Sequence, residues 1–220
     1  MQPPKNVMTR PRLALILHAL LALAALYALG PLVAGHVGGV GFLLVMLAAQ
    51  ALLFGLPAIW LHIDPADRAL IFSERLAWRD WWIFILLAIQ PPALALALLM
   101  PHTALLTSPA ASLAALIGIL HGPLVEIGWR GAVLSRFGQF PRLGFWLSWA
   151  LPLLAQGALW PLPGLALPID PVALLAGSAL LGLFWTWLAW RSFSVFWGSI
   201  AHALSATILL WLVLSANGIA

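Results

Sequence analysis

The sequence predicts an all-α, polytopic integral membrane protein, and its composition and long apolar stretches are the observations that predict this class. Of the 220 residues, 64% are hydrophobic and 7% are charged, and the mean hydropathy is +1.06. A chain of this composition could not stay soluble. A membrane-spanning helix needs about 20 apolar residues, so there is room for about six to eight crossings and no sizeable soluble domain. We therefore expect residues 1–220 to form a single transmembrane domain.

Seven apolar stretches are separated by short polar or proline-containing segments. The first follows a charged head like that of a signal peptide, but its apolar core is longer and further crossings follow, which favours a retained helix. The third contains Pro91 and Pro92, which should kink it midway. In chain order the expected crossings are Leu13–Gly30, Val37–Leu61, Trp81–Met100, the central helix within Ala110–Arg142, Gly144–Trp160, Pro171–Trp190 and Phe193–Leu214.

One charged segment, Ile63–Asp80, separates the second and third crossings. Leu70, Ile71, Leu76 and Trp78 lie between its charged residues, a pattern typical of a helix that lies along the membrane interface. A solvated loop would have a similar composition. Both interpretations stay open at this point.

The basic residues predict how the chain is oriented, because Lys and Arg in short loops stay on the cytoplasmic side. Apart from Arg130 in the central helix, all of them fall in the N-terminal head or in every second connection. The other connections, near Ala34–His36, Pro101–Pro109 and Leu162–Asp170, contain no Lys or Arg. We therefore expect a multi-pass protein of the bacterial inner (plasma) membrane, with its N-terminus in the cytoplasm and its C-terminus outside. The residues on the cytoplasmic side would be Lys5, Arg10, Arg12, Arg68, Arg75, Arg79, Arg136, Arg142 and Arg191.

Charge and cysteine content exclude several function classes. The sequence pI is about 11.2, but the ten Lys and Arg form no patch or run, so they indicate membrane orientation rather than a nucleic-acid partner. The absence of cysteine excludes disulfides, thiolate chemistry and Cys-ligated metals. We expect the lipid bilayer as a partner, and neither a nucleic acid nor a cofactor.

The central helix contains the residues that suggest chemistry. Glu126 and Arg130 lie inside an apolar run, where ionisable groups are costly and mark functional sites by default. They are four residues apart, so on a helix they share one face and can pair. Gly118 and Gly122 should let another helix approach closely, and Pro123 should open the backbone ladder one turn before Glu126. A structural ion pair and an active-site cavity are equally good interpretations on physical grounds.

Three short motifs resemble those of one family. The segment Val125–Gly131 reads Val-Glu-Ile-Gly-Trp-Arg-Gly, Ala158–Pro163 reads Ala-Leu-Trp-Pro-Leu-Pro, and Gly198–Ala206 contains His202. In order and spacing they resemble the Glu-Glu-x-x-x-Arg-Gly, aromatic-x-x-x-His and His-x-x-x-Asn motifs of the CPBP family, the CAAX-processing and bacteriocin-processing type membrane endopeptidases. The resemblance covers about half of the chain and implies a CPBP-type intramembrane protease fold with its core at about 110–214.

The chain departs from this family at half of the polar positions. The resemblance implies that Glu126, Arg130 and His202 are remnants of a catalytic site. In the family, the first glutamate and the second-motif histidine are thought to activate water, and the third-motif histidine and asparagine to stabilise the oxyanion. The replaced positions are Val125 for the first glutamate, Pro161 for the second-motif histidine and Ala206 for the asparagine.

These departures predict a catalytically degenerate homologue that binds a lipidated or transmembrane peptide, or a partner membrane protein, as a scaffold. The alternative is an active CAAX-type endopeptidase in which His121, Glu126 and His202 gather as base and metal ligands. On an ideal helix, however, His121 and Glu126 point about 140° apart, and Gln156 is the only further ligand nearby. We therefore expect no metal site. A transporter is disfavoured because neither paired repeats nor a polar path is visible.

Overall fold

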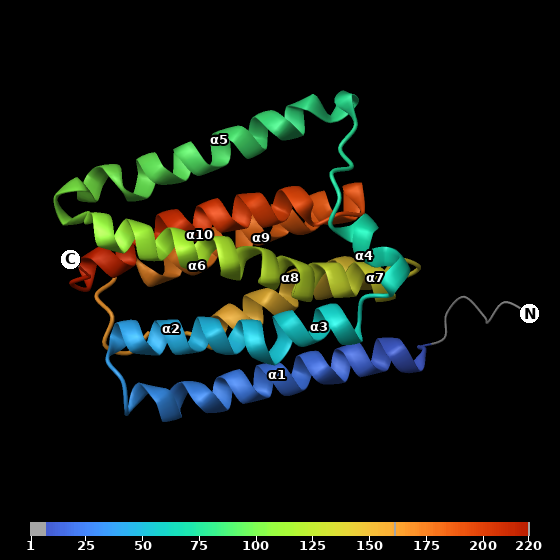
Figure 1. The fold of residues 1–220 in the computed structure, drawn as a ribbon, viewed down its shortest axis with the longest axis horizontal. Helices are drawn as coiled ribbons and strands as arrows, with labels where there is room; N and C mark the ends of the chain where they lie inside the picture. Colours follow the sequence, from blue (N-terminus) through green and yellow to red (C-terminus); the bar gives the residue numbers. More distant parts are fainter. Residues whose placement is uncertain (1–7, 161, 220) are drawn as a thin grey trace, which may run out of the picture.

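The computed structural model describes residues 8–160 and 162–219, and these contain helices and turns but no strand. The α-helices run side by side as a bundle (Figure 1), which confirms the all-α class. They are α1 (Arg10–Ala34), α2 (Gly39–Gln50), α3 (Leu56–Leu61), α4 (Pro65–Ile71), α5 (Trp81–Leu98), α6 (Ser108–Val125), α7 (Ala132–Phe137), α8 (Pro141–Gly157), α9 (Pro171–Ser192) and α10 (Phe196–Ala216).

Six spans within the described residues are long and apolar enough to cross a membrane, where the sequence predicts seven. The predicted fifth crossing corresponds to α8, which has only 17 residues. At 1.5 Å per residue it is about 26 Å long, shorter than a hydrocarbon core of about 30 Å. Its apolar stretch is cut short because the helix ends at Gly157, ahead of the proline-containing segment 161–171.

The central span consists of α6, a π-helical segment Glu126–Gly131, and α7. The helix continues through Pro123 and widens immediately after it, so the predicted distortion lies at the charged residues themselves. The α10 helix packs along α6, as the two glycines predict. A Cβ at Gly122 would lie 2.8 Å from the Cα of Ala203, and one at Gly118 would meet Thr207. This close crossing places α10 beside Glu126.

A second π-helical segment, Ala51–Gly55, lies between α2 and α3 and packs against the first. A Cβ at Gly128 would lie only 2.7 Å from the Cα of Gly55. Beside this glycine contact the rings of Phe54 and Trp129 stack with centroids 3.7 Å apart, and both side chains are fully buried. Segments of this kind often occur at functional sites. Here the two segments meet at Gly128 and Trp129, which lie between Glu126 and Arg130 in the sequence.

The charged segment 63–80 is neither a single interfacial helix nor a free loop. It contains the short helix α4 and a 3₁₀ turn, Trp78–Asp80. The carbonyl of Ile71, the last residue of α4, accepts from the backbone N–H of Val195 at 2.8 Å. The carbonyl of Ser73, which lies between α4 and the 3₁₀ turn, accepts from Ser194 Oγ. The segment is therefore fastened to the α9–α10 turn at one end of the bundle.

The α5 helix lies at the edge of the bundle (Figure 1). Only Ile83 and Leu87 of its side chains are buried. The helix continues through Pro91 and Pro92 as one element. With so little packing, its polar contacts to the other helices matter more for its position.

Candidate functional site

Glu126 and Arg130 lie in the π-helical segment of the central span, and both are buried. Arg130 Nη1 donates to Glu126 Oε1, so the pairing predicted from their spacing is confirmed. Two opposite charges held together cost much less to bury than either alone. Glu126 and Arg130 therefore form a buried ion pair inside the bundle.

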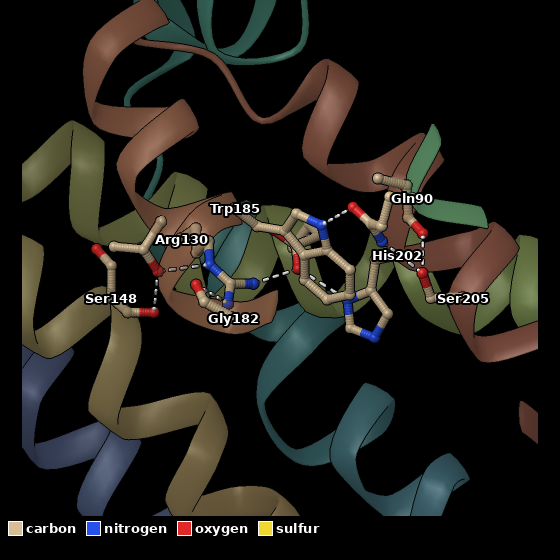
Figure 2. A network of polar contacts seen from close by, with 10 residues as sticks. Gln90, Arg130, Ser148, Gly182, Trp185, His202 and Ser205 are labelled. Atoms are coloured by element: carbon tan, nitrogen blue, oxygen red, sulfur yellow. Dashed lines mark hydrogen bonds and ion pairs between the residues drawn. The ribbon is translucent and has the colours of Figure 1, made fainter. Parts of the chain in front are cut away.

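Two further donors of Arg130 bond to α9. Its Nε donates to Thr186 Oγ1 at 3.0 Å. Its Nη2 donates to the carbonyl of Gly182 at 3.2 Å (Figure 2). Thr186 Oγ1 donates in turn to the carbonyl of Ser148 on α8 at 3.4 Å. The guanidinium thus holds α8 and α9 against the central span, and its charge is already neutralised by Glu126.

His202 on α10 completes the contacts of the same carboxylate. Its Nδ1 lies 2.7 Å from Glu126 Oε1. A carboxylate held by a guanidinium is an acceptor, so His202 Nδ1 donates to it and Nε2 is the ring nitrogen that Glu126 does not occupy. The other oxygen, Glu126 Oε2, has no hydrogen-bond partner within the part of the chain that the structure describes. Glu126 and His202, predicted from widely separated motifs, are therefore in direct contact.

Three residues that sequence reasoning missed hold the His202 ring in place. Trp185 stacks on it with centroids 4.7 Å apart. Trp185 Nε1 donates to Gln90 Oε1 at 3.1 Å, and Gln90 Nε2 donates to Ser205 Oγ at 2.7 Å (Figure 2). This chain of contacts joins α5, α9 and α10. A signal was present, because Gln90 is the one non-aromatic polar residue in the stretch 81–100.

A cavity of about 320 Å³ opens beside His202. Leucines from α2, α5, α9 and α10 make up most of its wall, together with the loop that follows α8. Its polar groups include His121, Gln156, Ser178 and Ser205. None of the described lining residues is Asp, Glu, Lys or Arg. The cavity is thus an apolar compartment with a small polar region.

His121 reaches this cavity from α6. Its ring packs edge-on against His202 with centroids 6.3 Å apart, and its Nε2 has no hydrogen-bond partner in the part of the chain that the structure describes. His202 therefore contacts both Glu126 and His121. Among the described residues, no three His, Asp or Glu side chains lie close enough together to hold a metal ion.

The central part of the chain matches a known family. Residues 107–208 match the family described as Rce1-like, type II CAAX prenyl endopeptidase Rce1-like. This match agrees with the resemblance to the CPBP family that the sequence motifs indicate. The span runs from the start of α6 into α10 and includes Glu126, Arg130 and His202. No curated protein and no solved structure matches the chain.

The positions at which this chain departs from the CPBP-family motifs lie in different surroundings. Val125 is buried in the apolar core, whereas Ala206 lines the cavity. Pro161, the third replaced position, lies outside the described residues. A methyl group at Ala206 offers no hydrogen bond to anything bound in the cavity.

Proposed function

We propose that this CPBP-family membrane protein binds a lipidated or transmembrane peptide in the cavity beside His202 without cleaving it. One observation carries the proposal: a cavity of about 320 Å³ lies beside the buried Glu126–His202 contact, while the replaced positions supply no second carboxylate and no amide. Largely apolar pockets of 300 Å³ and more, with a few convergent polar groups, are typical ligand sites.

Peptide hydrolysis needs a base that activates water and a donor that stabilises the oxyanion. Val125 cannot act as a base, and Ala206 cannot act as a donor. Glu126 Oε1 already accepts from Arg130 and from His202. These facts support binding as the retained activity.

The test combines cleavage and labelling on the purified protein in lipid nanodiscs. Prenylated peptides and leader peptides should not be cleaved above the level of an Arg130→Ala control, with or without added divalent metal. A lipidated peptide with a photoreactive group should nevertheless label the protein. Ala206→Trp, which fills the cavity, should abolish this labelling. Leu116→Trp, on an exposed face of α6, is the matched control and should leave it unchanged.

Cleavage that disappears in Glu126→Gln would refute the proposal, and so would labelling that survives Ala206→Trp. Installing proteolysis should require at least Val125→Glu together with Pro161→His. Either change alone leaves the water without one of its two activating partners.

The second candidate is an active endopeptidase with a divergent site. The observation in its favour is the Glu126–His202 contact, because a carboxylate on Nδ1 raises the basicity of the opposite nitrogen, Nε2. His202 would then be the general base for a water in the cavity. In the same cleavage assay, this candidate predicts activity in the wild type that both His202→Ala and Glu126→Gln remove.

A further inference from the structure

His121, one of the residues that line the cavity, has an unsatisfied polar atom. Its Nε2 is buried and has no hydrogen-bond partner among residues 8–160 and 162–219. Almost all buried polar side-chain atoms in folded proteins find a partner, so each exception calls for an explanation. The family motifs quoted above do not include position 121. A leucine here would fold without this cost, which suggests that the histidine is kept for a ligand.

Two imidazoles meet at this point of the wall. The ring of His202 lies edge-on to that of His121, and its Nδ1 is occupied by Glu126, so its free nitrogen is Nε2. A neutral imidazole nitrogen can donate or accept according to its tautomer. The pair can therefore satisfy one group that both donates and accepts, such as a hydroxyl or an amide.

The charges around the cavity argue against a charged ligand head. Its described lining contains no Lys, Arg, Asp or Glu. The nearest fixed cation, Arg130, is paired with Glu126 and bonded to Thr186 and Gly182. A carboxylate entering this cavity would lose its water without gaining a counterion, which is costly. An uncharged polar head loses far less.

We propose that His121, with His202 beside it, anchors an uncharged hydrogen-bonding head group, and that the leucine walls take the single hydrocarbon chain attached to it. This rests on the cavity being the binding site of the proposed function and names the chemistry of the part bound there. The ligand can be a free lipid alcohol or amide, or the lipid-modified end of a peptide whose terminus is uncharged.

The test is competition for a photoreactive hexadecanol analogue bound to the full chain in nanodiscs at mildly alkaline pH, where imidazoles are neutral. Hexadecanol should compete about tenfold better than hexadecane, the difference that one hydrogen bond makes. It should also compete better than hexadecanoate by about tenfold or more, because the carboxylate would be buried without a counterion. In a second arm, an S-hexadecyl-cysteine peptide is compared as its amide and its free acid. If the amide competes better than hexadecanol, the source is a peptide; the reverse order indicates a free lipid.

Variants separate the anchor from the fold. His121→Leu should lower the ratio of hexadecanol competition to hexadecane competition to about one. His121→Gln, which keeps a donor and an acceptor, should retain the wild-type ratio. His36→Leu is the matched control, because the His36 ring lies outside the cavity and bonds its own helix at Leu32. Without ligand, His121→Leu should unfold at the same or a higher temperature than the wild type, whereas loss of a merely structural histidine would lower it.

The failures of the two proposals are distinguishable. Labelling of the cavity without any head-group preference, or with a preference for the acid, overturns the anchor and leaves peptide binding standing. A preference that survives His121→Leu overturns the anchor as well. If no probe labels the wild type above empty nanodiscs, both proposals fail.

Discussion

At the scale of single residues, one carboxylate oxygen and its arginine partner together join three helical segments. Glu126 Oε1 accepts from Arg130 within its own segment and from His202 on α10. Arg130 is bonded in turn to α9. Loss of either charge therefore affects more than the partner that the sequence spacing indicates.

The buried pair predicts a non-additive pattern of stability. Glu126→Gln and Arg130→Met should each lower the free energy of unfolding by about 3–5 kcal/mol, because each leaves a buried charge uncompensated. The double variant should recover a large part of the loss, but not all of it, since the Gly182 carbonyl and Thr186 still lose their donor. Thermal unfolding of the four proteins in one detergent measures this. Losses that simply add would show that the two charges are not coupled.

His62 predicts a pH dependence of stability. It follows the second span, and its Nε2 lies 2.9 Å from His18 Nδ1; the other His18 nitrogen, Nε2, donates to the Leu53 carbonyl. The structure thus pairs two histidines that lie 44 positions apart in the sequence. Burial, then the neighbouring His18 and Arg136, lower the pKa of His62 from 6.5 to about 4.

The sign follows from proton binding. The unfolded chain takes up a proton as the pH falls through 6.5, while the folded chain resists until about 4. Stability from the neutral ring is therefore complete above the upper value and declines as the pH falls to the lower one. His62→Leu should flatten the unfolding temperature against pH across this window, and His36→Leu should not. An unchanged slope in His62→Leu would assign the pH dependence to other groups.

At the scale of elements, the two π-helical segments are held together by glycine contacts. Gly128 of one approaches the backbone of Gly55 of the other more closely than a Cβ allows. The widened turns and the missing side chains together allow the second span to pack against the charged stretch of the central one.

Adding one methyl group tests this packing. Gly128→Ala should lower the free energy of unfolding by about 1–3 kcal/mol, because the backbones must separate to relieve the overlap. Gly177→Ala on α9 is the matched control, since nothing lies within 4 Å of a Cβ there and alanine favours a helix by about 1 kcal/mol. Equal effects of the two substitutions on the thermal midpoint would mean that the π-segments are not closely packed in the membrane.

At the scale of the whole molecule, the basic connections gather at one end. Arg12 donates to the carbonyl of Arg136 at 2.8 Å, and Arg136 pairs with Asp64 at 2.7 Å. The start of α1 and the end of α10 lie at opposite ends of the bundle (Figure 1). Both features support the orientation that we propose, with the N-terminus in the cytoplasm and the C-terminus outside.

Reporter fusions test this orientation in bacterial cells. A reporter enzyme that works only in the periplasm should be active when fused after Ala220, and a fluorescent reporter that works only in the cytoplasm should stay dark. The same reporters inserted after Gln139, beside Arg136, should behave in the opposite way, because basic connections stay inside. A dark periplasmic reporter at both positions would leave an even number of crossings, with α8 not spanning the bilayer.

The sequence by itself determined the class of protein, most of its spans and the identity of its charged pair. Long apolar runs define helices locally, and two charges four residues apart meet on one helix without any tertiary contact. The motifs around Glu126 and His202 also indicated the family, because a motif needs only residue type, order and spacing. That part of the site could be predicted.

Only the tertiary structure decided which groups share the cavity. The contacts of Gln90 with Trp185 and Ser205 join residues about a hundred positions apart, and the contact between His121 and His202 depends on the close crossing of α6 and α10. Packing between segments likewise decides the short α8, the attachment of the charged segment 63–80 to the α9–α10 turn, and the His18–His62 pair. Helical periodicity predicts which face a residue occupies but not which helix will cover that face, because the covering helix is chosen by shape and by small residues such as Gly118, Gly122 and Gly128.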